Sequence, residues 1–293
     1  MEHFDPEFLR RLERLAIVAR KTLRGVGRGE RRSKRHGGTV EFADYRRYAP
    51  GDDTRQIDWY AYARLEQMFL KLYMEEQDLS LHLLVDQSAS MGAGEPPKLP
   101  YARRVAAALA YVGMAAGDQV SVRCCRGGER TRPLGPYRGR AQLVRLLQAL
   151  EQDDQARGET SLAGVARTFV AQRPAPGVVV VISDLLDPAG YAEPLERLRY
   201  TGHEVHLVHV VAPDEAEPEV GQDVDLVDAE TGEVAGVSLD QAAVREYRAA
   251  FQAYVDGVRA FCRKHEIGHV LPRTDHPFEE LVLDALRRGA LVR

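Results

Sequence analysis

The sequence predicts an α/β protein with an open, mostly parallel β-sheet that is flanked by helices on both faces. From residue 80 onward, short apolar runs alternate with amphipathic helical patterns, an order that implies right-handed crossover connections. The run at residues 176–184, PGVVVVISD, is continuously apolar, as expected of a strand that is covered on both faces. Two apolar runs end in a carboxylate, Asp86 and Asp184, and open α/β sheets bind ligands at that edge.

The first 78 residues are interpreted as a separate N-terminal region. Residues 4–19 repeat apolar side chains at helical spacing, which predicts a short amphipathic helix. Residues 21–38 contain seven Lys or Arg residues and one acid, which is typical of a solvated basic loop. Residues 39–75 combine aromatic and charged side chains around a PGDD turn, with a strand predicted at 69–73. We expect this last segment to wrap over the main domain.

Residues 79–293 are expected to form the main domain, with an insertion at about 213–240. The insertion is predicted to hold a β-hairpin that turns at Thr231 and Gly232. Apolar runs predict the other strands at 79–86, 119–125, 130–134, 176–184, 203–211 and 267–273. Helical spacing predicts helices at 99–116, 139–151, 161–172, 188–201, 241–265 and 277–289.

Composition excludes several classes of protein. A net charge of −4 disfavours a dedicated nucleic-acid binder, because phosphate binding requires an excess of positive charge. No window approaches the roughly 18 consecutive apolar residues of a membrane span, and the N-terminal residues lack a signal-peptide pattern. We therefore expect a cytoplasmic protein without a membrane span. The three cysteines, Cys124, Cys125 and Cys262, form no CxxC pair and are interpreted as buried thiols.

Oxygen-bearing side chains gather after the two acidic strand ends. Asp86, Ser88 and Ser90 alternate in the loop DQSAS, so that one tight loop can turn all three oxygens the same way. Thr160 lies in the polar loop RGETSL between the two strands, and Asp184 follows the apolar strand. Two carboxylates and three hydroxyls are ligands for a hard cation, Mg²⁺ or else Mn²⁺ or Ca²⁺. The absence of His and Cys from these loops disfavours zinc.

This set of ligands suggests that the site binds a partner rather than catalyses a reaction. Because several of the ligands are neutral hydroxyls, the ion keeps net positive charge, and a partner's Asp or Glu can occupy an open position. The purely structural alternative is that the Ser and Thr side chains cap the helices that follow.

The pattern resembles the metal-ion-dependent adhesion site of von Willebrand factor A domains. That family carries DxSxS, a distant Thr, and a distant Asp after an apolar strand, and all five positions match here. The resemblance implies a von Willebrand factor A, Rossmann-like fold. It also implies that Ser88, Ser90 and Thr160 coordinate the metal directly, whereas Asp86 and Asp184 act directly or through water.

The upstream block, from Tyr45 to Trp59 with Ala63 and Arg64 after it, resembles the bacterial family catalogued as domain of unknown function 58. In that family a Y-R-x-Y-x-P-G-D-D-x-R-x-I-D-W block precedes a von Willebrand A-like domain. Many members carry two N-terminal membrane helices, and this chain shows only the short amphipathic pattern. The resemblance implies a non-enzymatic partner or adaptor of a MoxR-type AAA+ ATPase, in protein-complex maturation or remodelling.

Two other functions stay open at the level of sequence. Acids at strand ends also serve Mg²⁺-dependent phosphohydrolases, although position 88 is Ser where the haloacid-dehalogenase type needs a second Asp. The basic run from Lys21 to Arg35 could contact nucleic acid. The charges between Arg46 and Arg64 could form a docking face, but we favour a buried ion-pair network. Asp187 either supports the metal loop or is simply solvated.

Overall fold

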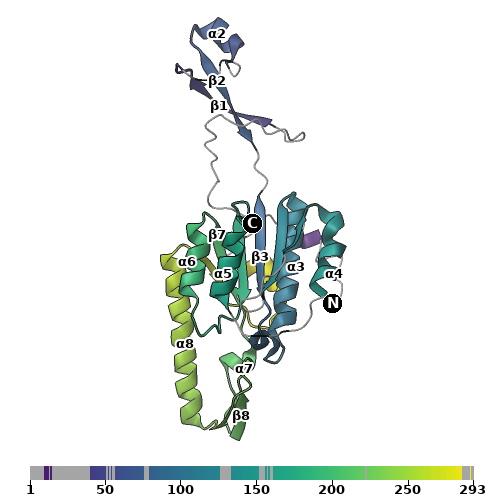
Figure 1. Cartoon of the computed structure of the whole chain (residues 1–293), viewed down its shortest axis with the longest axis vertical. Coiled ribbons are helices and arrows are strands. Elements are labelled where there is room, and N and C mark those ends of the chain that lie inside the picture. Colours follow the sequence, from purple (N-terminus) through teal and green to yellow (C-terminus); the bar gives the residue numbers. More distant parts are fainter. Residues whose placement is uncertain are drawn as a thin grey trace. The chain divides into compact units, whose positions relative to one another are not determined.

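The computed structural model describes residues 10–12, 14, 40–50, 52, 54, 57–75, 79–125, 133–151, 156, 158, 161–221, 223–285 and 291. The chain divides into two compact units, residues 23–78 and residues 79–293 together with 1–22 (Figure 1). Within the described part of the N-terminal helix pattern, residues 10–12 are helical and Leu12 is fully buried. The basic run 21–35 lies outside the described residues.

The smaller unit is built on an antiparallel pair of strands, β1 (Val40–Arg47) and β2 (Phe69–Glu75). The helix α2 (Trp59–Leu65) lies between them in sequence, and Asp58 caps it by accepting hydrogen bonds from Tyr60 N and Ala61 N. The strand predicted at 69–73 is confirmed, whereas β1 and α2 were not predicted. Charged side chains interrupt the apolar spacing in both segments, so that periodicity alone does not identify them.

The larger unit contains the predicted open sheet, and that prediction is confirmed. Its strands are ordered β10-β7-β6-β3-β4-β5, and of these only β5 is antiparallel to its neighbour. The strands are β3 (Ser80–Asp86), β4 (Gln119–Cys125), β5 (Leu134–Tyr137), β6 (Val178–Ser183), β7 (Glu204–His209) and β10 (Gly268–Val270). The edge strand was predicted too early, at 130–134. It contains Gly135 and Pro136, residue types that strand patterns exclude but edge strands tolerate.

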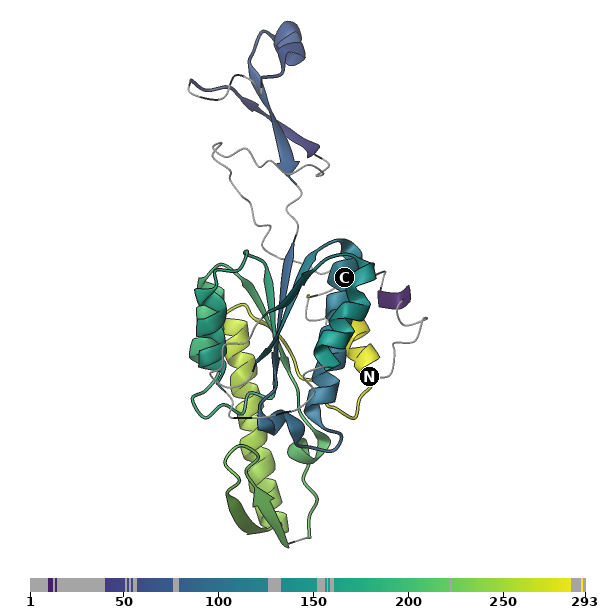
Figure 2. The same ribbon diagram turned by 45° about the vertical axis from the view of Figure 1, so that its right-hand side comes forward.

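Helices cover both faces of this sheet (Figures 1 and 2). One face packs against α3 (Lys98–Ala116), α4 (Leu143–Glu151), α9 (Phe278–Glu280) and the π-helix η4 (Leu281–Ala285). The other packs against α5 (Leu162–Ala171), α6 (Ala192–Tyr200) and α8 (Gln241–Lys264). Alternate residues of β3 enter the two cores: Leu83 packs toward α3 and Leu84 toward α5. The sheet is therefore covered on both sides, as its apolar strands predicted.

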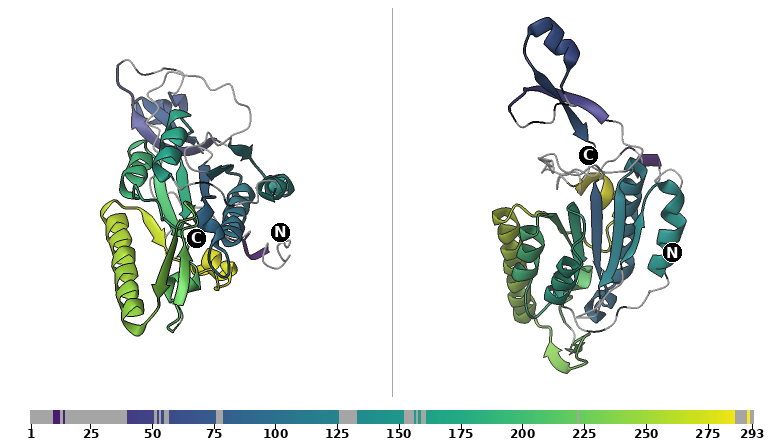
Figure 3. Two further views of the ribbon diagram at one scale, coloured as in Figure 1. Left: turned by 60° about the horizontal axis from the view of Figure 1, so that its bottom comes forward. Right: turned by 45° about the horizontal axis from the view of Figure 1, so that its top comes forward.

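The insertion between β7 and α8 contains α7 (Pro213–Ala216) and an antiparallel hairpin of β8 (Asp223–Val227) and β9 (Val234–Ser238). Two short 3₁₀ helices, η2 (Ala89–Gly92) and η3 (Arg140–Gln142), complete the regular structure of the described residues. Figure 3 shows the larger unit from two further sides, with the hairpin projecting beyond the sheet. None of the helices in the described ranges is long and apolar enough to cross a membrane.

Candidate metal site at the switch point of the sheet

The two acidic strand ends meet where the winding of the sheet reverses. β3 and β6 are parallel neighbours, but the chain continues from β3 to β4 on one side and from β6 to β7 on the other. Such a reversal opens a crevice at the carboxyl ends of the two strands, where α/β sheets bind ligands. Asp86 is the last residue of β3, and Asp184 follows the last residue of β6. The topology thus places one predicted carboxylate on each side of the crevice.

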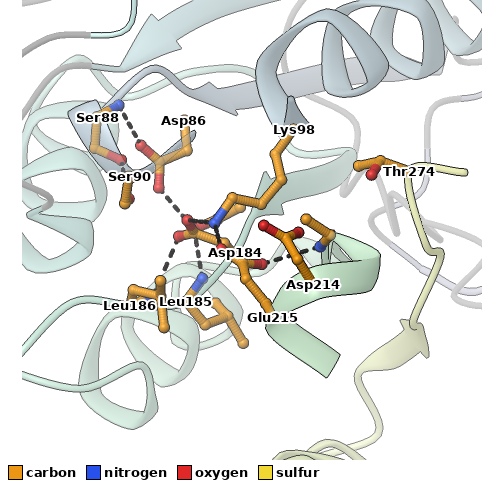
Figure 4. Close-up of polar contacts among 12 residues, drawn as sticks. Asp86, Ser88, Ser90, Lys98, Asp184, Leu185, Leu186, Asp214, Glu215 and Thr274 are labelled. Carbon is orange, nitrogen blue, oxygen red and sulfur yellow. Dashed lines mark hydrogen bonds and ion pairs between the residues drawn. The ribbon is translucent and has the colours of Figure 1, made fainter. Parts of the chain in front are cut away.

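The DQSAS loop brings the Asp86 carboxylate and the two serine hydroxyls close together (Figure 4). Ser88 N donates to Asp86 Oδ1 at 2.9 Å, and the hydroxyl oxygens of Ser88 and Ser90 lie 3.0 Å apart. All three side chains are buried. Ser88 precedes η2, yet its side chain makes no capping hydrogen bond. Helix capping therefore does not account for the Ser88 hydroxyl.

The loop that carries Thr160 is described only on its two sides, and Thr160 itself lies outside the described residues. On one side, Ala89 N donates to Gly158 O at 3.0 Å. On the other, Ser161 and Asp86 line the same small cavity of about 10 Å³. One flank of this loop therefore bonds to the loop that follows β3, and the other shares a cavity with the end of β3.

Asp187 supports this edge of the sheet rather than being solvated. Its Oδ2 accepts from Leu162 N, and its Oδ1 accepts from Ala189 N, both at 2.8 Å. The carboxylate is buried and joins the loop after β6 to the start of α5. Of the two roles considered from the sequence, the structure shows the supporting one for the loops around the site.

The structure adds a cation that the sequence analysis missed. Lys98, the first residue of α3, is fully buried, and its Nζ donates to Asp184 Oδ2 at 2.8 Å. The same Nζ donates to Glu215 Oε1 of α7, and Glu215 Oε2 accepts from Ala212 N at 2.9 Å (Figure 4). Burial lowers the pKa of Lys98, but the negative charges of Asp184 and Glu215 outweigh burial and raise it. The ammonium group is therefore charged.

A signal for Lys98 was present in the sequence. A basic residue in the first turn of a helix opposes the helix dipole, so a lysine at that position suggests a specific acidic partner. The apolar spacing predicts a helix start at residue 99, one residue after the start of α3 at Lys98, and so leaves Lys98 in the preceding loop.

The electrostatics of the two aspartates differ. Burial raises the pKa of Asp86 to about 6, and the charge of Asp184 raises it too, against hydrogen bonds from Ser183 and Ser88. Asp184 is buried with Lys98 on its Oδ2, while its Oδ1 accepts from Leu186 N at 3.2 Å. Asp86 is thus the carboxylate that forms hydrogen bonds but no ion pair with the described residues.

The donors fit a hard cation better than a soft one. Among the described residues, no group of three or more His, Cys, Asp or Glu side chains is arranged to hold a metal. A metal here would depend on the hydroxyls of Ser88 and Ser90 beside the carboxylates, as Mg²⁺ and Ca²⁺ tolerate and zinc does not favour. The buried negative charge at Asp86 supplies the electrostatic attraction for such an ion.

Several other predicted features have clear outcomes. The three cysteines are buried free thiols, as predicted. The buried ion-pair network between Arg46 and Arg64 is wrong for the described residues, because Arg46 pairs with Asp52 at the surface and Arg64 is exposed. The smaller unit has few buried side chains among its described residues, so the long side chains of Arg46 and Arg64 extend into solvent. Only Asp58 of this group is described as buried, and it accepts from Tyr45 Oη at 2.8 Å.

Comparisons with known proteins agree with the sequence pattern. The profile of the family described as "Protein of unknown function DUF58" matches residues 44–257. Uncharacterized proteins of Mycobacterium tuberculosis and Mycobacterium bovis are 31% identical over 298 residues, which cover 98% of this chain and 92% of each relative. Among solved structures, BatB from Bacteroides thetaiotaomicron is 17% identical with a TM-score of 0.43, covering 72% of this chain and 98% of that one. A von Willebrand factor type A structure from Catenulispora acidiphila is 13% identical with a TM-score of 0.39, covering 75% and 43%.

Proposed function

This chain belongs to the DUF58 family, and from the geometry of its switch-point crevice we propose that it is a non-enzymatic protein-interaction module that depends on a divalent cation. The observation that carries the proposal is the convergence of Asp86, Ser88 and Ser90 beside Asp184. A bound Mg²⁺, Mn²⁺ or Ca²⁺ would supply a positive contact for a carboxylate. Asp86, Ser88, Ser90 and Asp184 are the described residues that would hold it, and Thr160 is the fifth proposed ligand.

The surface next to the site supports docking of a protein. Leu186 lies two residues after Asp184, donates its N–H to that carboxylate, and leaves its side chain 52% exposed. An exposed leucine beside a charged crevice offers a partner both an apolar contact and an ionic one. We propose that the partner presents an Asp or Glu to the cation. From the family resemblance, we propose a MoxR-type AAA+ ATPase as that partner.

The absence of catalysis is part of the proposal. Ser88 occupies the position at which a phosphohydrolase of the haloacid-dehalogenase type requires its acid–base carboxylate. Its hydroxyl lies 3.0 Å from the Ser90 hydroxyl, an arrangement that provides ligands rather than a proton-transferring acid. A phosphatase screen of the purified chain tests this point, and robust turnover that Asp86→Asn abolishes would favour the enzyme.

The decisive experiment measures partner binding with magnesium and with chelator. The full chain is immobilised and exposed to purified MoxR-type ATPase of the same organism, with Asp86→Asn as the test variant. Asp256→Asn is the control, because this exposed aspartate lies on α8 and pairs with Arg259 at the surface. We expect binding in magnesium that is lost with chelator and in Asp86→Asn but kept in Asp256→Asn. Equal binding in chelator would reject metal dependence.

A further inference from the structure

The buried lysine beside the crevice is the least expected group in the fold. Lys98 has no exposed surface, and it bridges two carboxylates from separate elements, Asp184 after β6 and Glu215 in α7. Withdrawing an ammonium group from water is costly and is repaid only by close acidic partners. Asp184, one of the proposed metal ligands, is therefore already paired with a positive charge, the ammonium group of Lys98.

We propose that Lys98 is a built-in competitor of the divalent cation: it neutralises Asp184 in the metal-free protein and yields that carboxylate, turning to Glu215, when a cation binds. This inference rests on the proposed function. Its new content is that Lys98 and Glu215 set the affinity of the site although neither is a metal ligand. The crevice would then have a metal-free form, in which Lys98 pairs with Asp184, and a metal-bound form, in which Asp184 pairs with the cation and Lys98 with Glu215.

The charges of the site support the competition. Lys98 and a divalent cation are both positive, and both would be drawn to the same buried carboxylate, where repulsion between them is weakly screened. Lysine is a compact charge on a flexible stem and can rotate between two acceptors. Glu215 is suited to receive it, since its side chain is 25% exposed and already accepts from Nζ. Competition thus requires a rotation within the existing bridge rather than a new pair.

The bridge also connects the crevice to the insertion. Glu215 belongs to α7, and Glu215 O accepts from Tyr247 Oη of α8 at 2.7 Å. A shift of Lys98 from Asp184 to Glu215 therefore changes the charge balance on the helix that leads into the β8–β9 hairpin. If Lys98 served only as a structural bridge, its removal would leave cation affinity unchanged or reduce it.

Mn²⁺ titration calorimetry of the full chain tests the inference, with Lys98→Met and Glu215→Gln as variants. Lys98→Met removes the competing charge and keeps the apolar stem, so we expect it to tighten Mn²⁺ binding by about tenfold or more. Glu215→Gln removes the negative charge that would hold Lys98 away from Asp184, so Lys98 stays on Asp184 and binding weakens by about threefold or more. Asp214→Asn is the matched control, since Asp214 is the neighbouring acid of α7 and its Oδ1 accepts from Glu95 N instead.

The outcomes separate this inference from the proposed function. Mn²⁺ binding by the wild type that Lys98→Met leaves unchanged or weakens overturns the competition and leaves the proposed function standing. Binding by Lys98→Met alone supports the competition and overturns metal dependence of the wild type. Binding by neither overturns both. Melting in chelator verifies that each variant is folded; if Lys98→Met is unfolded, Glu215→Gln decides, and wild-type affinity in that variant overturns the inference.

Discussion

The hydroxyl of Ser183 donates to Asp86 Oδ2 at 2.7 Å and joins the ends of the two central strands. The direction of this bond is fixed because the Asp86 carboxylate can only accept, and Ser183 Oγ in turn accepts from Leu185 N at 3.0 Å. With Ser88 N on its other oxygen, Asp86 is held at both oxygens by neutral donors. The proposed ligand is therefore oriented by groups that do not neutralise its charge.

Replacement of Ser183 by alanine should damage both stability and metal binding. The change leaves Asp86 Oδ2 and Leu185 N without this buried partner, which costs about 1–2 kcal/mol of unfolding free energy. The freed carboxylate can also rotate away from the crevice, so we expect weaker Mn²⁺ binding. Urea unfolding in chelator and Mn²⁺ calorimetry measure the two effects. Unchanged Mn²⁺ affinity would show that Ser183 does not position Asp86.

Asp86→Asn and Asp184→Asn should change stability in opposite directions. Asp86 is buried near another carboxylate and its pKa is raised to about 6, so at pH 7 its charge destabilises the fold. The neutral amide relieves that cost and should add about 1–2 kcal/mol in chelator. Asp184→Asn instead removes one partner of buried Lys98 and should cost about 3 kcal/mol. Urea unfolding of the two variants side by side tests this, and equal losses would contradict it.

The sequence predicted the parallel strands of the larger unit and their acidic ends because apolar runs carry those signals, whereas charged side chains concealed β1, and Gly135 and Pro136 shifted the predicted position of β5. Asp86 and Asp184 could be assigned to one crevice since both follow apolar strands of a parallel sheet. Glu215 could not, because its role depends on where a four-residue helix of the insertion lies in space. Lys98 carried a local signal, a basic residue in the first turn of a helix, but no local pattern brings residue 98 beside residues 184 and 215.

The close approach of β3 and β6 should make Gly177→Ala strongly destabilising. A Cβ at Gly177 would lie 2.0 Å from Ser80 O, a backbone atom that cannot move without shifting β3. We expect a loss of about 2 kcal/mol or more, the range of overpacked sites. Gly257→Ala in α8 is the matched control, since the nearest atom is Tyr191 Oη at 3.8 Å and alanine favours a helix. Thermal melting compares the two, and a stable Gly177→Ala protein would be at odds with this packing.

A buried histidine beneath α5 should make the protein sensitive to acid. His82 Nε2 lies 2.9 Å from Ala175 O and Nδ1 lies 2.8 Å from Ser121 Oγ, so the neutral ring satisfies both nitrogens. Burial lowers the pKa of His82 to about 4, and the positive charges of His203 and Arg123 lower it too, against the Ala175 hydrogen bond. His203 packs edge-on against His82, with the ring centroids 5.6 Å apart, and the Arg123 guanidinium lies over the Phe169 ring, which is itself 5.2 Å from the His82 ring.

The sign of the effect follows from the lowered pKa. Between pH 6.5 and about 4 the unfolded chain binds a proton at His82 that the folded chain does not, so stability is complete above pH 6.5 and falls as the pH drops through this window. The loss from this group is about 1.4 kcal/mol for each pH unit. His82→Gln should flatten the dependence by about that slope, measured by urea unfolding between pH 7 and 4.5 in chelator. Asp86 has a raised pKa and therefore changes stability in the opposite direction over this range, but its contribution is the same in both proteins and cancels in the comparison. Parallel stability curves for wild type and variant would show that His82 is not the group that titrates.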